Sequence, residues 1–173
     1  MQQSWFRPPS CGHAAGMTDK TLHDVLDGLT FAMVATADPS HGGTWKSRPL
    51  ALAGQDGSVL SFLVGVDADW VQGLEHEGSP ATVTFSDQSK NVWVALQGGA
   101  RTRDDRQRIA ELWNVGAGAY FEGKDDPKVR VLEFTVDYGE WWESPSGVLG
   151  RAVTLASAAL GKPVGDQGPV VPQ

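Results

Sequence analysis

Two cationic side chains stand two residues apart in the segment Lys46-Ser47-Arg48-Pro49-Leu50. Side chains alternate along a β-strand, so Lys46 and Arg48 would share one face of a strand and could converge on one anion. Pro49 has no N–H for a neighbouring strand, which favours an edge or a ligand-facing position. The alternative is a basic strand face that contacts only water. The residues alone leave both interpretations open.

Other polar residues of the sequence do not form a catalytic or metal-binding motif. The four histidines lie far apart in the sequence, at His13, His23, His41 and His76. Neither a phosphate-binding loop of the Gly-x-x-x-x-Gly-Lys-Ser type nor a Gly-x-Ser-x-Gly elbow occurs. Asp38 and His41 flank Ser40, but adjacent polar residues in one turn are typical of a loop rather than of a triad. The sequence therefore predicts no metal site and leaves the catalytic residues unknown.

The composition excludes several classes of partner. The 173 residues include 14 Lys and Arg against 21 Asp and Glu, which gives a net charge of -7. A negative net charge disfavours binding to nucleic acid and to anionic membrane surfaces. No run reaches the roughly 20 apolar residues that span a bilayer, and the single Cys11 cannot form an intrachain disulfide. We expect a cytoplasmic protein with no membrane or nucleic-acid partner.

Hydrophobic patterns predict six strands and a few short helices. An Asp-Gly pair within 55–58 is typical of a tight hairpin. Hairpin connections favour an antiparallel barrel over a parallel sheet, because parallel strands need a crossover between each pair. The fold class is therefore mainly β, a barrel with peripheral helices. The strands are expected at residues 31–36, 44–53, 59–64, 81–86, 91–103 and 129–137.

The expected helices occupy the ends of this pattern and its longer connections. One covers residues 20–29 with Thr18 or Asp19 as its cap, and a second starts at Asp67 or Asp69 and ends near residue 77. A third follows the acidic pair at 104–105, because negative charge stabilises a helix N-terminus.

Composition also sets the expected limits of the domain. Residues 1–16 are rich in Pro and Gly and predict a disordered leader, so Met17 is a plausible natural start. The barrel domain is expected over 17–145. Residues 146–173 are expected to form a partly disordered tail, with a small-residue helix at 148–160 and disorder over 161–173.

The second half of the chain carries a distinctive order of motifs. They are the strand Val92–Arg101, then Leu112-Trp113-Asn114, then Tyr120–Pro127, then Glu140-Trp141-Trp142. This order resembles the general stress protein branch of the pyridoxamine 5'-phosphate oxidase-like FMN-binding split barrels, over about residues 18–145. The resemblance implies a six-stranded antiparallel Greek-key split barrel. It further implies a homodimer that holds FMN in the groove between its subunits.

The resemblance also implies which residues face the flavin. Arg48 matches the arginine that reaches the flavin phosphate, and the backbone beside it matches the segment that lines the ring. Trp113 and Trp141 match positions with structural or ring-contacting roles. The implied cofactor-binding residues are Lys46, Ser47, Arg48, Pro49, Leu50, Phe62, Leu63, Val64, Ala68, Asp69, Trp70, Trp113 and Trp141.

This chain departs from the resembling family at the implied phosphate site. The family's Thr, Ser and Lys correspond to Val64, Ala68 and Trp70, and Asp67 and Asp69 add negative charge. Each charge-assisted hydrogen bond contributes about 1.5–3 kcal/mol, so the loss of two suggests about 3–6 kcal/mol, or on the order of 10²–10⁴ in affinity. Compensation could come from the cations Lys46, Arg101 or Arg103, from the helix N-terminus near Ala68, or from stacking of Trp70 on the ligand.

Two main hypotheses of function follow from these observations. The first is an FMN-binding oxidoreductase-like protein of the general stress type. The alternative is a repurposed split barrel with weak or no FMN binding, which binds a deazaflavin, haem or another aromatic anion, or acts without catalysis. A purely structural or chaperone-like dimer is a third hypothesis. Whether the protein is an enzyme stays open.

The tryptophans admit a simpler explanation alongside the ligand-based one. Seven are present, and core packing together with a subunit interface would account for Trp45 and Trp93. Because neighbouring strand residues point to opposite sides, one of Trp141 and Trp142 could face a ligand while the other packs.

Overall fold

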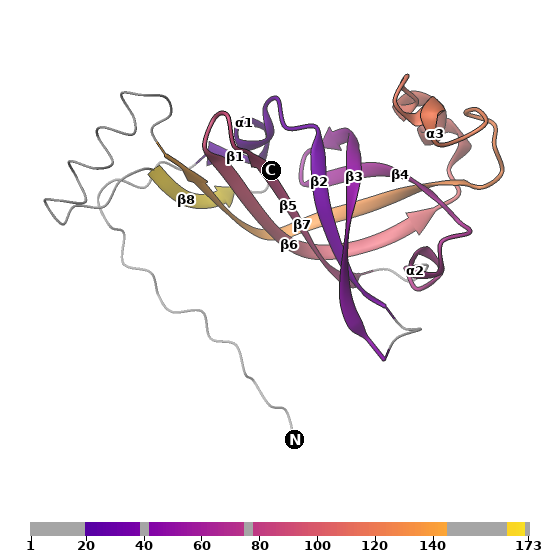
Figure 1. Ribbon diagram of the computed structural model, residues 1–173, viewed down its shortest axis with the longest axis horizontal. Coiled ribbons are helices and arrows are strands. Elements are labelled where there is room, and N and C mark those ends of the chain that lie inside the picture. The colour runs from indigo at the N-terminus through magenta and orange to yellow at the C-terminus, as the bar shows by residue number, and fades with distance from the viewer. Residues whose placement is uncertain (1–19, 39–41, 75–77, 145–165, 172–173) are drawn as a thin grey trace, which may run out of the picture.

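The computed structural model describes residues 20–38, 42–74, 78–144 and 166–171, and it is mostly β-structure (Figure 1). Its sheet has the strand order β1-β8-β7-β4-β3-β2-β5-β6, and an additional pairing of β6 with β7 closes β2 to β7 into a six-stranded barrel. This confirms the predicted mainly β class and the antiparallel barrel. The elements are β1 (Lys20–Thr21), α1 (Leu22–Leu26), β2 (Phe31–Asp38), β3 (Thr44–Asp56), β4 (Val59–Gly65), α2 (Asp69–Gln72), β5 (Ser79–Asp87), β6 (Val92–Arg103), α3 (Arg106–Leu112), a 3-10 turn (Ala117–Ala119), β7 (Val129–Glu143) and β8 (Asp166–Val171).

The barrel interior is filled by alternate residues of the strands. In β2 the even-numbered residues are buried, and their odd-numbered neighbours are at least partly accessible. This period of two places one side of each strand in the core. Burial of this apolar surface is the main source of stability. Fully buried core residues include Val34, Leu60, Phe62, Val83 and Phe134.

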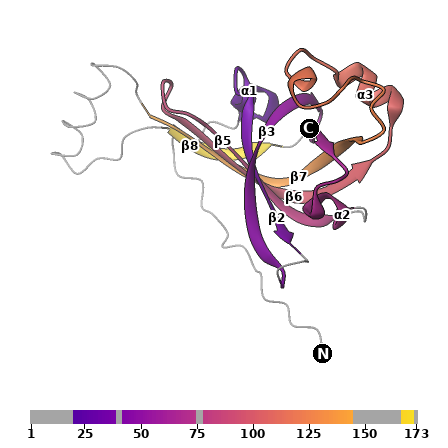
Figure 2. The same ribbon diagram turned by 45° about the vertical axis from the view of Figure 1, so that its right-hand side comes forward.

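The sheet splits between β3 and β4. Strand β3 pairs with β2 over Thr44–Ala51, but its pairing with β4 begins only at Leu52, opposite Phe62. The first half of β3 therefore has a strand neighbour on one side only. Helix α2 follows β4, and both views place α2 and α3 on the side of the barrel opposite β8 (Figures 1 and 2).

The helices are shorter than the sequence predicts and have other caps. Thr21, not Thr18 or Asp19, caps α1, because its hydroxyl and the Asp24 carboxylate form a reciprocal capping box. The N-cap of α2 is Ala68, without a side-chain hydrogen bond, so the expected capping by Asp67 or Asp69 is wrong. The third helix agrees with expectation, with Asp105 as its N-cap.

Strands β2, β3, β4, β5 and β7 extend beyond the predicted limits, and β5 and β7 show why. Strand β5 starts at Ser79 and includes Pro80, which pairs with Gly99 of β6, while pairing with β2 begins at Ala81. Pro80 is tolerated because β5 has only one strand neighbour there. Strand β7 continues to Glu143 rather than ending at residue 137, since β6 and β8 both pair with its second half.

The C-terminal segment contains a strand that composition does not predict. Residues 166–171 form β8, which pairs antiparallel with β7 and parallel with β1, so the expectation of disorder over 161–173 is wrong for these residues. Val170 anchors the strand because its side chain enters the core beside Gly139. The expected leader 1–16, the start at Met17, the helix at 148–160 and the Ser40–His41 turn lie outside the described residues. Among the described helices, none has the length and apolarity to cross a membrane.

Candidate functional site

Arg48 lies in the split, on the half of β3 that has no partner on its β4 side. Its Nη1 donates to the hydroxyl of Thr36 at 3.1 Å and to the carbonyl of Lys46 at 3.2 Å. Its guanidinium lies over the ring of Trp70, 4.2 Å from the ring centre. Burial lowers the pKa of the Arg48 guanidinium, while the charge of Asp38 acts in the opposite direction. A guanidinium stays protonated near neutral pH, so Arg48 is a fixed positive charge.

Lys46 shares the strand face of Arg48, as predicted, but it contacts a different group. Its Nζ lies 2.7 Å from the buried carboxylate of Asp38, the last residue of β2. The register of the two strands places Thr36 opposite Lys46 and Val34 opposite Arg48, so these side chains share one side of the two strands. Lys46 and Arg48 thus make different direct contacts, although the charge of Asp38 also acts on Arg48.

The side chains around Arg48 are mostly apolar. Val64 and Phe62 are buried in the main core, and Leu50, Ala68 and Trp70 pack against it. None of these residues except Trp70 has a side-chain donor, and its indole ring covers Arg48. The described part of the chain thus offers Arg48, and beside it the Lys46–Asp38 pair, as the charged groups of the split.

Arg101 and Arg103, which could have replaced the missing phosphate ligands, already form ion pairs with Glu133. The Nε atoms of Arg101 and Arg103, on β6, lie 2.8 and 3.5 Å from the same carboxylate oxygen of Glu133 on β7. A paired cation contributes less to an incoming anion because the carboxylate offsets its charge. The donor set fits a single anionic group at Arg48 better than it fits a doubly charged phosphate.

A groove of about 470 Å³ lies on the outer face of the barrel, and Pro49 is one of the residues that line it. Pro49 and Ser47 are exposed on the side of β3 opposite to Arg48. The groove is largely apolar and aromatic, and its volume lies in the range of small-molecule sites, about 300–1,000 Å³. Its larger lining side chains are Phe31, Met33, Pro49, Trp93 and Trp142.

The Trp pair at the end of β7 divides between the two sides of the barrel wall. Trp141 is 1% exposed and belongs to the core, whereas Trp142 pairs with Trp93 across β6 and β7 and lines the groove. The expectation that the two indoles point to opposite sides is confirmed. Core packing does not account for Trp45 and Trp93, because these side chains are 55% and 40% exposed, and their place at a subunit interface stays a prediction.

Two of the predicted site residues lie in a second cluster of the protein. Leu63 and Trp113 pack against the smaller core formed with α3 and the start of β7. Trp113 also contacts Phe121, with ring centroids 6.4 Å apart. Asp69 lies in the first turn of α2, next to Trp70. The structure thus brings together Arg48 and Trp70, whereas Trp113 packs in the second cluster.

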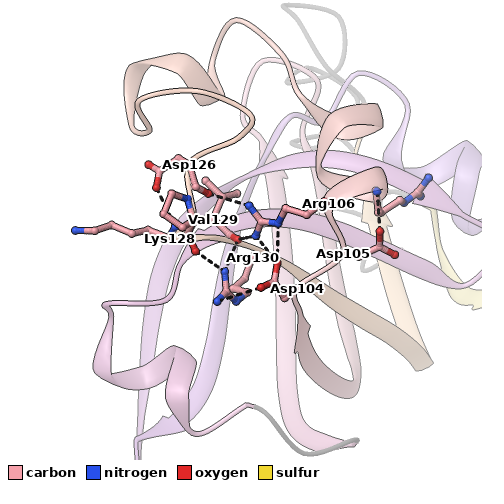
Figure 3. A network of polar contacts seen from close by, with 9 residues as sticks. Asp104, Asp105, Arg106, Asp126, Lys128, Val129 and Arg130 are labelled. Atoms are coloured by element: carbon pink, nitrogen blue, oxygen red, sulfur yellow. Dashed lines mark hydrogen bonds and ion pairs between the residues drawn. The ribbon is translucent and has the colours of Figure 1, made fainter.

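A polar network ties the connection before β7 to the barrel (Figure 3). Arg106 donates to the carbonyls of Asp126 and Val129, and both Arg106 and Arg130 contact the carboxylate of Asp104. The Asp126 carboxylate accepts from the backbone N–H of Lys128 at 2.8 Å. This network fixes the segment that carries Lys128.

Lys128 connects that segment to the turn which precedes α2. Its Nζ lies 2.8 Å from the carboxylate of Asp67, and this hydrogen bond raises the pKa of Lys128. A second link is the hydrogen bond from the Val66 N–H to the Lys128 carbonyl at 2.8 Å. The backbone hydrogen bond ties the turn before α2 to this segment, whereas the Lys128–Asp67 pair is 64% and 67% exposed and adds little.

A second hollow of about 840 Å³ lies on the same outer face, nearer the start of β5. Its floor includes the bare backbone of Gly98 and Gly99, and Trp45 and Tyr138 contribute to its walls. Within the described ranges, no cluster of three or more His, Cys, Asp or Glu side chains is arranged to hold a metal ion.

A closed six-stranded barrel that splits beside an Arg-Pro strand defines the class of split β-barrels. The chain belongs to the pyridoxamine 5'-phosphate oxidase-like family, whose model matches residues 18–166. The expected family and fold class are therefore confirmed.

Individual relatives agree with this assignment. A crystal structure from Jannaschia sp. CCS1, of a protein described as a candidate general stress protein 26, is 25% identical, with a TM-score of 0.68 over 86% of this chain and 94% of that one. The general stress FMN/FAD binding protein of Xanthomonas citri is 24% identical, with a TM-score of 0.61 over 72% and 87%. Protein bli-3 of Neurospora crassa is 23% identical and covers 84% of this chain and 76% of its own.

Proposed function

We propose that the protein binds a flavin-type ligand, with FMN as the first candidate, and that it acts as an oxidoreductase-like protein of the general stress type. The observation that carries the proposal is the position of the Arg48–Pro49 pair: Pro49 lines an aromatic groove, and Arg48 lies on the other side of the same strand, in the split. A ligand whose flat ring packs over Pro49 and whose polar chain reaches Arg48 would contact both residues. A relative with the same fold is an FMN/FAD binding protein, which supports this reading.

We further propose that the site lies at the interface of a homodimer. The groove is open and bordered by exposed aromatic side chains, among them Phe31, which is 66% exposed. A second copy seated on this face would cover these side chains and enclose the ring. The flavin would supply the redox chemistry, and the chain would supply its orientation and exclude water.

The alternative is a split barrel that binds FMN weakly or not at all and takes a deazaflavin, haem or another aromatic anion instead, or acts without catalysis. The contact of Trp70 with Arg48 favours it, because the indole lies where the resembling family has a cation. Val64 and Ala68 add no donor to the site.

The absorption spectrum of freshly purified protein, followed by flavin titration, tests the proposal. Flavin binding should give the visible absorption bands of an oxidised flavin and quench the flavin fluorescence. A variant with Pro49→Asp should weaken binding, because it places a carboxylate on the groove floor. The matched control is Ala51→Asp, because Ala51 is exposed on the same side of β3 but lies outside the lining of this groove. If the protein binds neither FMN nor riboflavin at any accessible concentration, the flavin proposal is wrong.

A further inference from the structure

The buried carboxylate of Asp38 changes the charge of the split. It lies 2.7 Å from Lys46 Nζ and is almost fully buried, so the pair has little net charge. Of the two cations that β3 sends into the split, Arg48 alone then adds net positive charge to it. None of the ion pairs in the described ranges involves Arg48. A doubly charged phosphate would therefore meet a net charge of about one at this position.

Trp70 reduces access to that remaining charge. Its ring covers one face of the Arg48 guanidinium at 4.2 Å, and Nη1 is turned toward Thr36 and the Lys46 carbonyl. An anion that approaches this guanidinium must displace an indole or bind at its edge. The stacking itself is favourable, which adds to the energy needed for rearrangement.

The elements around the split do not compensate for these losses. Val64 at the end of β4 and Ala68 before α2 carry no donor, and Asp69 lies in the first turn of α2 beside Trp70. Helix α2 has only four residues, so its N-terminus contributes little positive potential. A phosphate carries about −1.5 to −2 charges at pH 7, and the split supplies no matching set of donors.

The groove at Pro49 is by contrast suited to a flat aromatic ring. Four large side chains, Phe31, Met33, Trp93 and Trp142, line it together with Pro49. Aromatic side chains bind planar rings through offset stacking and burial of apolar area, which do not depend on charge. Recognition should thus be concentrated at the ring end of the ligand.

We propose that Asp38 and Trp70 remove phosphate selectivity from this site, so that the ligand is a flavin-type tricycle recognised through its ring, whether or not it is phosphorylated. This inference rests on the proposed flavin binding. It assigns to Asp38 and Trp70 the role of specificity-determining residues for the ligand's anionic end.

The test compares FMN with riboflavin, which differs from FMN only by the phosphate. In the unaltered protein, the two dissociation constants from fluorescence titration should agree within about threefold. Asp38→Asn keeps the size of the side chain but leaves Lys46 with its charge, so it should tighten FMN by about tenfold and leave riboflavin unchanged. The control, Asp56→Asn, makes the same change in net charge at the exposed far end of β3 and should alter neither ligand.

A second variant tests the role of Trp70, and it keeps the inference testable if Asp38→Asn does not fold. Ala68→Ser with Trp70→Lys adds a hydroxyl and a cation and uncovers Arg48, so FMN should again gain about tenfold and riboflavin should gain little. FMN that binds the unaltered protein more than about tenfold tighter than riboflavin would overturn the inference and leave the proposed flavin binding intact. Equal gains for both ligands in these variants would also overturn it. If neither flavin binds, the proposed function itself is wrong, and this inference falls with it.

Discussion

The guanidinium of Arg48 lies 4.2 Å from the centre of the Trp70 ring, which joins β3 to α2 across the split of the barrel. Sequence separation gives no hint of this contact, and the two residues come from elements that share no hydrogen-bonded pairing. A cation–π contact at a partly buried site contributes about 0.5–2 kcal/mol. The contact therefore both positions α2 and determines what an incoming anion meets.

A double-mutant cycle should measure this contact directly. We expect Arg48→Leu and Trp70→Leu to be coupled by about 1 kcal/mol in the free energy of unfolding, as measured by denaturant titration. Arg48→Lys should retain part of the coupling, because it keeps a cation but loses the flat stacking geometry. Additive effects of the two leucine variants would show that the contact does not contribute to stability.

The exposed aromatic face predicts a homodimer. Phe31 and Trp93 lie on the outer face of β2 and β6, and the pair Phe31→Ser with Trp93→Ser should shift the protein toward monomer in sedimentation across a dilution series. Stability of the monomer should change little, because both side chains are exposed in it. Val115→Ser is the control, since Val115 is 96% exposed but lies in the loop after α3. An unaltered protein that sediments as a monomer at micromolar concentration would contradict the dimer.

Gly98 should be intolerant of any side chain. A Cβ at this position would lie 1.9 Å from the carbonyl oxygen of Thr135, at the irregularity where β6 shifts its register against β7. We expect Gly98→Ala to lower the free energy of unfolding by at least about 2 kcal/mol, as measured by thermal or denaturant unfolding. Gly118→Ala is the control, because a Cβ there meets no atom within 4 Å, and it should change stability by less than about 0.5 kcal/mol.

The barrel could be predicted because its strands carry local signals. The Asp-Gly hairpin at residues 56–57 and the alternation within β7 are short-range sequence patterns, and the structure contains the elements that they predict. Strand β8 has no such signal: its Gly168 and Pro169 are typical of a loop, and it forms because Val170 fits against Gly139 on β7. That complementarity joins residues far apart in sequence, which composition cannot reveal.

The site could be predicted only in part, because its ion pair and its exposed aromatic side chains also depend on how the strands pack. Arg48 and Pro49 stand out by type and spacing, but Asp38 looks like the start of a turn, and its partner Lys46 follows on the next strand. Phe31 and Met33 belong to a fully apolar run, which favours burial of both sides of the strand. The structure shows instead that one side of β2 is exposed.

Val170 should anchor the C-terminal strand. Its side chain is 4% exposed, whereas that of the neighbouring Val171 is 40% exposed. We expect Val170→Ser to lower the free energy of unfolding by about 2 kcal/mol and Val171→Ser to lower it by less than about 0.5 kcal/mol. Chemical denaturation of the two variants compares the same Val→Ser change at a buried and at an exposed position. Equal effects would mean that β8 does not seal the core in solution.

The capping box of α1 predicts how stability depends on acid. The hydroxyl of Thr21 donates to the Asp24 carboxylate at 2.6 Å, and this hydrogen bond, with that of the Thr21 N–H, lowers the pKa of Asp24. A carboxyl whose pKa is lower in the folded than in the unfolded protein adds stability above its unfolded pKa of about 3.9. That stability disappears as the pH falls through the folded pKa.

Asp24→Asn should therefore lower the melting temperature at pH 7, and the difference from the unaltered protein should shrink as the pH falls through the folded pKa of Asp24. Asparagine resembles the protonated carboxyl in size and charge, so the two proteins become nearly equivalent in acid. Thr21→Val removes the donating hydroxyl, and Asp24→Asn in that background should have a smaller effect at pH 7. Thermal unfolding of the four proteins across the pH series makes the measurement. A difference that persists undiminished in acid would mean that the carboxylate charge of Asp24 does not stabilise the cap.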